Sequence, residues 1–167
     1  MLTAHLPTLD MAQVETEFRA QIAHFARIVG HPPDHLDSHH HITYLSPPMI
    51  TLMALIAREL GVPVRYPIPD NHRQAVDLLL DIKAVPNAAA AEETLDVLQG
   101  ALRKASIVTP DSFIPTFYGL GATLGTLLNI LVALPTGTSE LMCHPGVVDD
   151  QLRTISGYDD KRQDELA

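Results

Sequence analysis

The chain alternates between short strand-like stretches and longer stretches with helical spacing, and this alternation limits its fold more than any other feature. Repeated strand–helix units are typical of a parallel sheet covered by helices. Four strands are too few to close a barrel, because the smallest parallel barrels have about eight. The sequence therefore predicts an α/β fold with a short parallel sheet flanked by helices. The strands are expected within residues 35–41, 62–66, 106–109 and 138–143.

Capping residues mark the expected helices. Asp10 is a plausible N-cap with Gln13 as its capping-box partner, and Gly30 is placed to end the same helix. Helical pieces are also expected after Val147. Further helices are expected from Pro47 or Pro48 to Leu60, from Asp70 to about Lys83, from Asn87 to Lys104 and from Thr123 to Leu134.

Composition indicates one globular domain spanning residues 1–167, with 46% apolar and 19% charged residues. The longest apolar stretch, 127–134, is far shorter than the roughly 20 residues that a bilayer requires, so no membrane span is expected. The N-terminus has no basic region ahead of an apolar core, and the single cysteine, Cys143, excludes an internal disulfide. A cytoplasmic location is the resulting expectation.

The net charge of −9 excludes several classes of partner. A chain this acidic lacks the basic surface that neutralises phosphates, so no nucleic acid is expected to bind. A long anionic polymer is disfavoured as a substrate for the same reason. Neutral or cationic small molecules, including sugars, remain open.

The run from His35 to His41 holds four of the nine histidines and one acid. Neutral imidazole is the commonest protein ligand for transition metals and a usual general acid or base near neutral pH. If the run is extended, Asp37, His39 and His41 point to one face. A metal or catalytic site is favoured over a polar surface loop. An expression tag is disfavoured, because the run is internal and interrupted by Asp and Ser.

A second cluster lies at Glu140–Gly146, where an apolar strand ends in His144-Pro145-Gly146. Ligands gather at the carboxyl ends of parallel strands, so His39 and His144 are both expected there. The alternative for His144 is a histidine that caps a turn. Cys143 is expected to be a small buried hydrophobe, and its use as a thiolate nucleophile is the alternative.

Two further side chains are candidates for the site. Arg65, at the end of a predicted strand, is placed to orient a carboxylate or a substrate oxygen, and a surface ion pair is the alternative. Tyr118 is placed to line a pocket, and a core position is the alternative. The isolated histidines are expected at the surface; they are His5, His24, His31 and His72.

The two clusters, in this order, resemble the YdjC-like carbohydrate deacetylases, also called the chitooligosaccharide and hopanoid-associated deacetylase group. The histidine run and the Met-Cys-His-Pro-Gly run together are specific for this resemblance, which covers nearly the whole chain. The matching segments are 33–41, 64–65, 117–119 and 140–146, with Tyr158 and 162–166 similar to the family's next helix.

The resemblance implies an irregular (β/α) barrel and a divalent metal ion, Mg or Zn. It implies hydrolysis of an N-acetyl group on a small amino sugar or oligosaccharide, a reaction of carbohydrate metabolism. His39 is then a metal ligand. His144 donates a proton or stabilises the oxyanion, and Asp37 orients a ligand of the metal. The residues that contact the substrate are His41, Arg65 and Tyr118. His41 or Asp37 could also fill the metal's coordination sphere.

The chain departs from the family pattern in ways that affect activity. It has neither the upstream Asp-Asp-Phe-Gly motif nor the Gly-Leu-His motif, and so is expected to lack about the first third of the family domain. Thr43 stands where a further histidine is common. The fragment is therefore expected either to be inactive or to pair with a second copy, as a homodimer, or with another chain. A non-catalytic metal- or carbohydrate-binding module is the alternative function, and a cysteine hydrolase built on Cys143 is a third.

Overall fold

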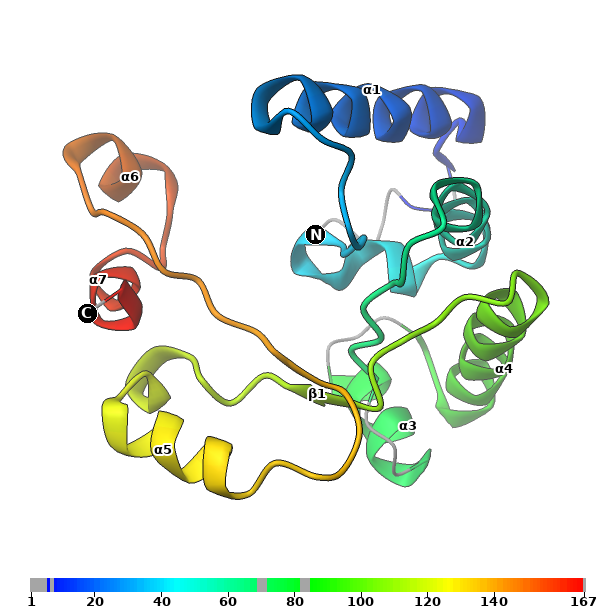
Figure 1. Cartoon of the computed structure of the whole chain (residues 1–167). Helices are drawn as coiled ribbons and strands as arrows, with labels where there is room; N and C mark the ends of the chain where they lie inside the picture. Colours follow the sequence, from blue (N-terminus) through cyan, green and yellow to red (C-terminus); the bar gives the residue numbers. More distant parts are fainter. Residues whose placement is uncertain (1–5, 7, 69–71, 82–84, 167) are drawn as a thin grey trace. The chain divides into compact units, whose positions relative to one another are not determined.

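The computed structural model describes residues 6, 8–68, 72–81 and 85–166, and these residues form a mixed α/β structure (Figure 1). The chain divides into two compact units, Met1–Thr109 and Pro110–Ala167. A short parallel sheet of two strands lies in the second unit, as the sequence predicted. Within the described part of the chain, none of the helices has both the length and the apolar character needed to cross a bilayer.

The first unit opens with two helices whose ends follow the predicted signals. Helix α1 (Met11–Val29) begins after Asp10, whose carboxylate accepts a hydrogen bond from the Ala12 N–H rather than from Gln13. It ends at Gly30, whose φ of 90° is the left-handed conformation that glycine adopts without strain. Helix α2 (Pro47–Leu60) starts at a proline pair and ends at Gly61.

Two later helices complete the first unit. Helix α3 (His72–Asp81) falls within the predicted range, and the proposed cap Asp70 lies outside the described residues. Helix α4 (Ala88–Lys104) begins where predicted, because the Asn87 side chain accepts a hydrogen bond from the Ala90 N–H. Helix α4 packs against both α2 and α3.

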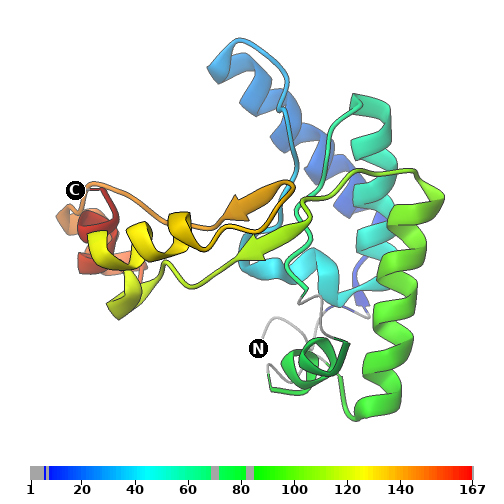
Figure 2. The ribbon, with the colours of Figure 1, turned by 60° about the horizontal axis from the view of Figure 1, so that its bottom comes forward.

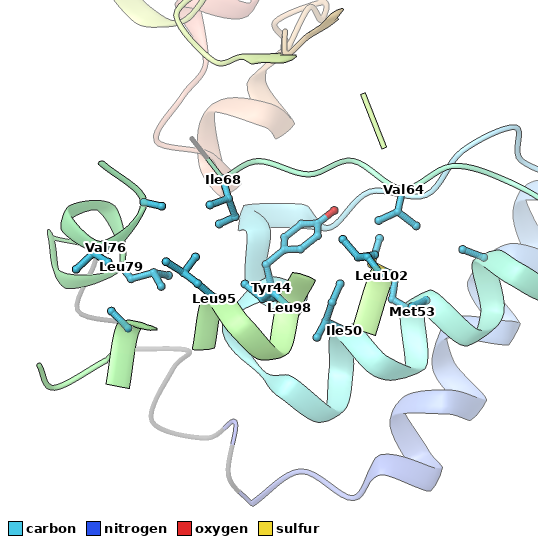
Figure 3. Packing of buried hydrophobic residues seen from close by; sticks show 14 residues of the cluster. Tyr44, Ile50, Met53, Val64, Ile68, Val76, Leu79, Leu95, Leu98 and Leu102 are labelled. Atoms are coloured by element: carbon cyan, nitrogen blue, oxygen red, sulfur yellow. The ribbon is translucent and has the colours of Figure 1, made fainter. Parts of the chain in front are cut away.

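The core of the first unit is built from apolar side chains of α2, α3 and α4 together with Tyr44 (Figure 3). Tyr44 is 0% exposed, and its hydroxyl donates a 2.6 Å hydrogen bond to the Arg65 carbonyl. This bond satisfies the one polar atom of the buried ring, as a buried phenol requires. The other largest fully buried side chains are Ile50, Ile56, Leu79, Leu98 and Val64.

Three extended segments run side by side next to this core. Leu36 pairs with Val64 in a parallel bridge, and the Arg65 N–H donates to the Leu36 carbonyl at 2.9 Å. The Val64 N–H in turn donates to the Val108 carbonyl at 3.0 Å. The predicted strands at 35–41 and 62–66 thus reduce to a single bridge. The strand expected at 106–109 is not formed, since Ser106 has a left-handed φ of 55°.

The second unit holds the parallel pair of strands β1 (Ser112–Ile114) and β2 (Ser139–Leu141), which Figure 2 shows side by side. Strand β2 lies within the predicted range 138–143. Strand β1 begins after the predicted strand segment 106–109 and does not overlap it. Helix α5 (Leu124–Val132) connects the two strands, and its N-cap Thr123 accepts a hydrogen bond from the Thr126 N–H. The remaining elements are the 3₁₀ turn η3 (Gly119–Gly121), α6 (Asp150–Ile155) and α7 (Asp160–Leu166).

Candidate functional site

The histidine run forms a tight turn and not a continuous strand. After Leu36 the chain enters the 3₁₀ segment η2 (His39–Leu45), in which His40 and His41 have φ values of 52° and 56°. The prediction of an extended run that aligns Asp37, His39 and His41 is therefore wrong. The physical reason is that Ser38 closes a turn, in which its carbonyl accepts from the His41 N–H and its side chain accepts from the Thr43 N–H.

Left-handed backbone is unfavourable at histidine. It costs roughly 1–2 kcal/mol per non-glycine residue, because Cβ approaches the following carbonyl oxygen. Two consecutive residues in this conformation persist only where the surrounding structure determines them. Such strain is concentrated at functional sites in proteins, which supports the run as part of one.

Ser38 holds this turn, and the sequence analysis did not single it out. Its side chain is 7% exposed, and its Oγ accepts a hydrogen bond from the Thr43 N–H at 2.9 Å. Its carbonyl accepts a second bond from the His41 N–H at 2.9 Å. A serine ahead of a turn is a common local cap, and that was the available signal.

Replacing Ser38 by alanine is expected to destabilise the protein by about 1–3 kcal/mol, because the buried Thr43 N–H loses its acceptor. Ser46→Ala is the matched control, since Ser46 is similarly buried at 5% exposure but its side chain does not cap α2. Urea unfolding followed by circular dichroism measures both changes. Equal losses in the two variants would contradict the role given to Ser38.

Asp37 and Arg65 are brought together, although they lie on different segments. Arg65 Nη1 is 2.9 Å from Asp37 Oδ2, and the Arg65 side chain is 14% exposed against 45% for Asp37. The parallel bridge between Leu36 and Val64 places the two residues side by side. Asp37 is thus engaged by a cation of its own chain. This arrangement suits a residue that orients a neighbour better than it suits a free general base.

A cavity of about 230 Å³ in the first unit is bordered by Asp37 and His39. His39 is exposed, and its ring centroid lies 4.2 Å from that of His40. The cavity is lined by Asp37, Ser38, His39 and Thr43 from the turn, and by Phe18, Gln21, Ile22, Leu36, Ile42, Met53 and Ile56.

The described residues do not fit a complete metal centre. Across residues 8–68, 72–81 and 85–166, no three His, Cys, Asp or Glu side chains gather as a metal ion requires. A catalytic zinc normally keeps three protein ligands. His39 is therefore a single candidate donor.

The second unit places His144 beside two stacked tyrosine rings. His144 follows β2 and is half-buried, with ring centroids 5.3 Å from Tyr118 and 5.7 Å from Tyr158 in edge-on contacts. The two tyrosine rings stack on each other at 4.3 Å. Tyr118 is 47% exposed, so it lines a surface and is not a core residue. The structure thus brings together His144 and Tyr118, two of the predicted site residues.

The tail of the chain holds the His144 backbone, which sequence reasoning missed. The His144 N–H donates to the Glu165 carboxylate, and the His144 carbonyl accepts from Arg162 Nη1 at 3.3 Å. The Tyr158 hydroxyl donates to Glu165 and accepts from the Gly119 N–H at 2.9 Å. The only sequence signal for these residues was their place in the segments that resemble the family's next helix.

Burial raises the pKa of the Tyr158 hydroxyl above its ordinary value, and the hydrogen bond to Glu165 raises it further. A raised pKa means that the folded protein favours the neutral phenol. The associated stability is complete below the ordinary tyrosine pKa of about 10 and is lost as pH rises through the higher folded value. Tyr158 is therefore a neutral hydrogen-bond donor at physiological pH.

Cys143 and the side chains of the isolated histidines are either exposed or lie outside the described residues. Cys143 is exposed, so the expectation of a buried hydrophobe is wrong, because the chain after β2 runs along the surface of this unit. His24 and His31 are exposed as predicted. His5 and the side chain of His72 lie outside the described residues.

Comparison with known proteins identifies the family. The model for YdjC-like protein matches residues 2–167. A carbohydrate deacetylase of Thermoanaerobacter pseudethanolicus is 31% identical over 95% of this chain and 51% of its own length. A chitooligosaccharide deacetylase of Yersinia pestis is 30% identical over 96% of this chain and 53% of its own.

A solved structure has a similar fold. A crystal structure from Enterococcus faecalis V583, described as a "putative cellobiose-phosphate cleavage protein", superimposes with a TM-score of 0.65 at 26% identity. The match covers 95% of this chain and 52% of that one. The chain thus spans about half the length of the relatives it matches. Since the family model covers nearly all of its residues, the chain belongs to the YdjC-like protein family.

Proposed function

We propose that this chain carries part of the active site of a metal-dependent carbohydrate N-deacetylase. The observation that carries the proposal is His144, whose imidazole lies against an exposed tyrosine while the protein holds its backbone N–H and carbonyl. The names of the relatives support the reaction class. An N-acetylated amino sugar or oligosaccharide is the proposed substrate. The irregular (β/α) barrel is the fold proposed for the complete domain.

Hydrolysis of an N-acetyl group needs an activated water, stabilisation of the oxyanion and a proton for the leaving amine. A bound Mg²⁺ or Zn²⁺ would activate the water and polarise the carbonyl. In this chain, His144 gives the proton to the amine or stabilises the oxyanion. The exposed ring of Tyr118 offers a face on which a sugar can stack. Arg65 keeps Asp37 oriented next to His39, the candidate metal ligand.

The metal part of the proposal is tested by removing one imidazole. His39→Ala is expected to weaken binding of Zn²⁺ or Mg²⁺ by roughly tenfold or more, because even groups outside the ligand set typically contribute 10–100-fold. His40→Ala is the matched control, since it removes the neighbouring exposed imidazole. Isothermal titration calorimetry with each metal measures the change. Equal affinities in the wild type and His39→Ala would contradict the role of His39.

The second candidate is a non-catalytic metal- or carbohydrate-binding module. It is favoured by the incomplete ligand set of the described residues. Binding of N-acetylated chitooligosaccharides without release of acetate would select this candidate. Release of acetate that chelation abolishes would select the deacetylase.

A further inference from the structure

The turn that carries His144 is attached to α7 by three hydrogen bonds. Glu165 accepts the His144 N–H, and Arg162 Nη1 donates to the His144 carbonyl at 3.3 Å. The Gly146 N–H donates to the Arg162 carbonyl at 3.1 Å. Residues close to the end of the chain thus hold both main-chain polar groups of the candidate catalytic histidine.

The Glu165 carboxylate also orients Tyr158, whose ring stacks on that of Tyr118. Glu165 accepts the Tyr158 O–H, and the Tyr158 hydroxyl accepts the Gly119 N–H at 2.9 Å. The Tyr158 ring stacks on Tyr118, which is the residue before Gly119. The two oxygens of Glu165 therefore connect the His144 turn to the loop that carries Tyr118.

Arg162 also contacts Tyr158. Its Nε donates to the Tyr158 carbonyl at 2.7 Å, and its guanidinium carbon lies 5.5 Å from the centre of the Tyr158 ring. Hydrogen bonds to a charged acceptor, such as the two that Glu165 accepts, are stronger than hydrogen bonds between neutral groups. A carboxylate that accepts two such bonds is a strong local constraint on both partners.

We propose that Glu165 is a positioning residue that holds the His144 imidazole and the Tyr118–Tyr158 stack in the geometry the reaction needs. This inference rests on the proposed function, because it takes His144 as the group that acts on the substrate. Both carboxylate oxygens of Glu165 accept hydrogen bonds from this chain, one from the His144 N–H and one from the Tyr158 hydroxyl. Glu165 acts by fixing the main chain at His144 and the ring of Tyr158, and a misplacement of about 1 Å in an active site is enough to lower a rate about 100-fold.

The test replaces Glu165 by glutamine and compares it with Asp164→Asn. Both variants remove one negative charge from α7, but Asp164 pairs with Lys161 and does not contact the His144 turn. His144 and Tyr158 donate to different oxygens of Glu165, and glutamine replaces one of these oxygens by an NH₂ group that cannot accept, so one of the two hydrogen bonds is lost. Glu165→Gln is expected to lower kcat for acetate release about 10–100-fold, while Asp164→Asn leaves kcat unchanged.

Two spectroscopic measurements decide the proposal independently of activity. In ¹⁵N-histidine NMR, the ring signals of His144, assigned from a His144→Ala spectrum, are expected to shift in Glu165→Gln and to stay in place in Asp164→Asn. In an absorbance titration of tyrosinate, the pKa of Tyr158 is expected to fall in Glu165→Gln, because the hydrogen bond to Glu165 and the negative charge of Glu165 both raise it in the wild type. Burial keeps it above the ordinary value.

The outcomes separate this inference from the proposed function. A wild type that releases no acetate contradicts the proposed function, and the spectra then decide the role of Glu165 alone. Ring signals of His144 that are the same in Glu165→Gln and Asp164→Asn overturn the inference. If circular dichroism shows that Glu165→Gln is unfolded, Glu165→Asp takes its place. It keeps the charge but withdraws the carboxylate, and unchanged His144 signals in this variant would overturn the inference as well.

Discussion

His144→Ala is expected to lower kcat for acetate release from N-acetylated chitooligosaccharides by about 10²–10⁴-fold, the usual contribution of a positioned general acid or base. The expectation follows from the edge-on contact of the imidazole with exposed Tyr118 and from the two hydrogen bonds to its main chain. If the imidazole acts only in the transition state, kcat and kcat/KM fall together. A rise in KM alone would instead assign His144 to substrate binding.

Cys143→Ala is the control for this substitution. Cys143 is the preceding residue and is exposed, so its replacement by alanine removes no buried contact. Activity is expected to survive Cys143→Ala and thiol alkylation, and to be lost on chelation. The opposite pattern, with loss in Cys143→Ala and retention in His144→Ala, would establish the cysteine hydrolase and remove the deacetylase mechanism.

Leu98→Ala is expected to destabilise the first unit by about 2–5 kcal/mol, the cost of deleting a buried leucine side chain and leaving a cavity. Leu98 is 1% exposed and belongs to the core cluster around Tyr44 (Figure 3). Helix α4 contacts both α2 and α3, so a cavity at Leu98 weakens the packing of several elements. Denaturant unfolding followed by far-ultraviolet circular dichroism measures the loss.

The control for the core is Leu55→Ala on α2. Leu55 is 38% exposed, and the same deletion there is expected to cost within about 0.5 kcal/mol, as at most surface positions. The comparison removes the effect of the residue type, because both variants replace leucine by alanine in a helix. Similar losses at the two positions would contradict the assignment of Leu98 to the core.

Helix boundaries were the part of the fold that the sequence predicted best. Asp10, Asn87 and Thr123 cap their helices, and the helices that end at Gly30 and Gly61 do so in left-handed backbone. These features depend on hydrogen bonds between residues that are close in sequence, so the local residue pattern contains the information. The parallel pairing of the strands followed from the helices between them.

Sequence reasoning was less successful for strand positions. The segment 106–109 is interrupted by left-handed Ser106, and β1 lies after it. Short apolar runs satisfy several registers equally well, and the choice among them depends on which partner segment is adjacent. The single domain over residues 1–167 and the cytoplasmic location stay predictions.

The sequence by itself determined the family, through two histidine-containing motifs, and the limits of most helices, through their caps. The tertiary structure alone decided how those histidines are held. The left-handed turn at His40 and His41 depends on Ser38 and Thr43, and the fixed backbone of His144 depends on Glu165, which is 21 residues away. Helix caps are settled by neighbouring residues, whereas the contact between His144 and Glu165 forms only after segments that are distant in the sequence have packed together.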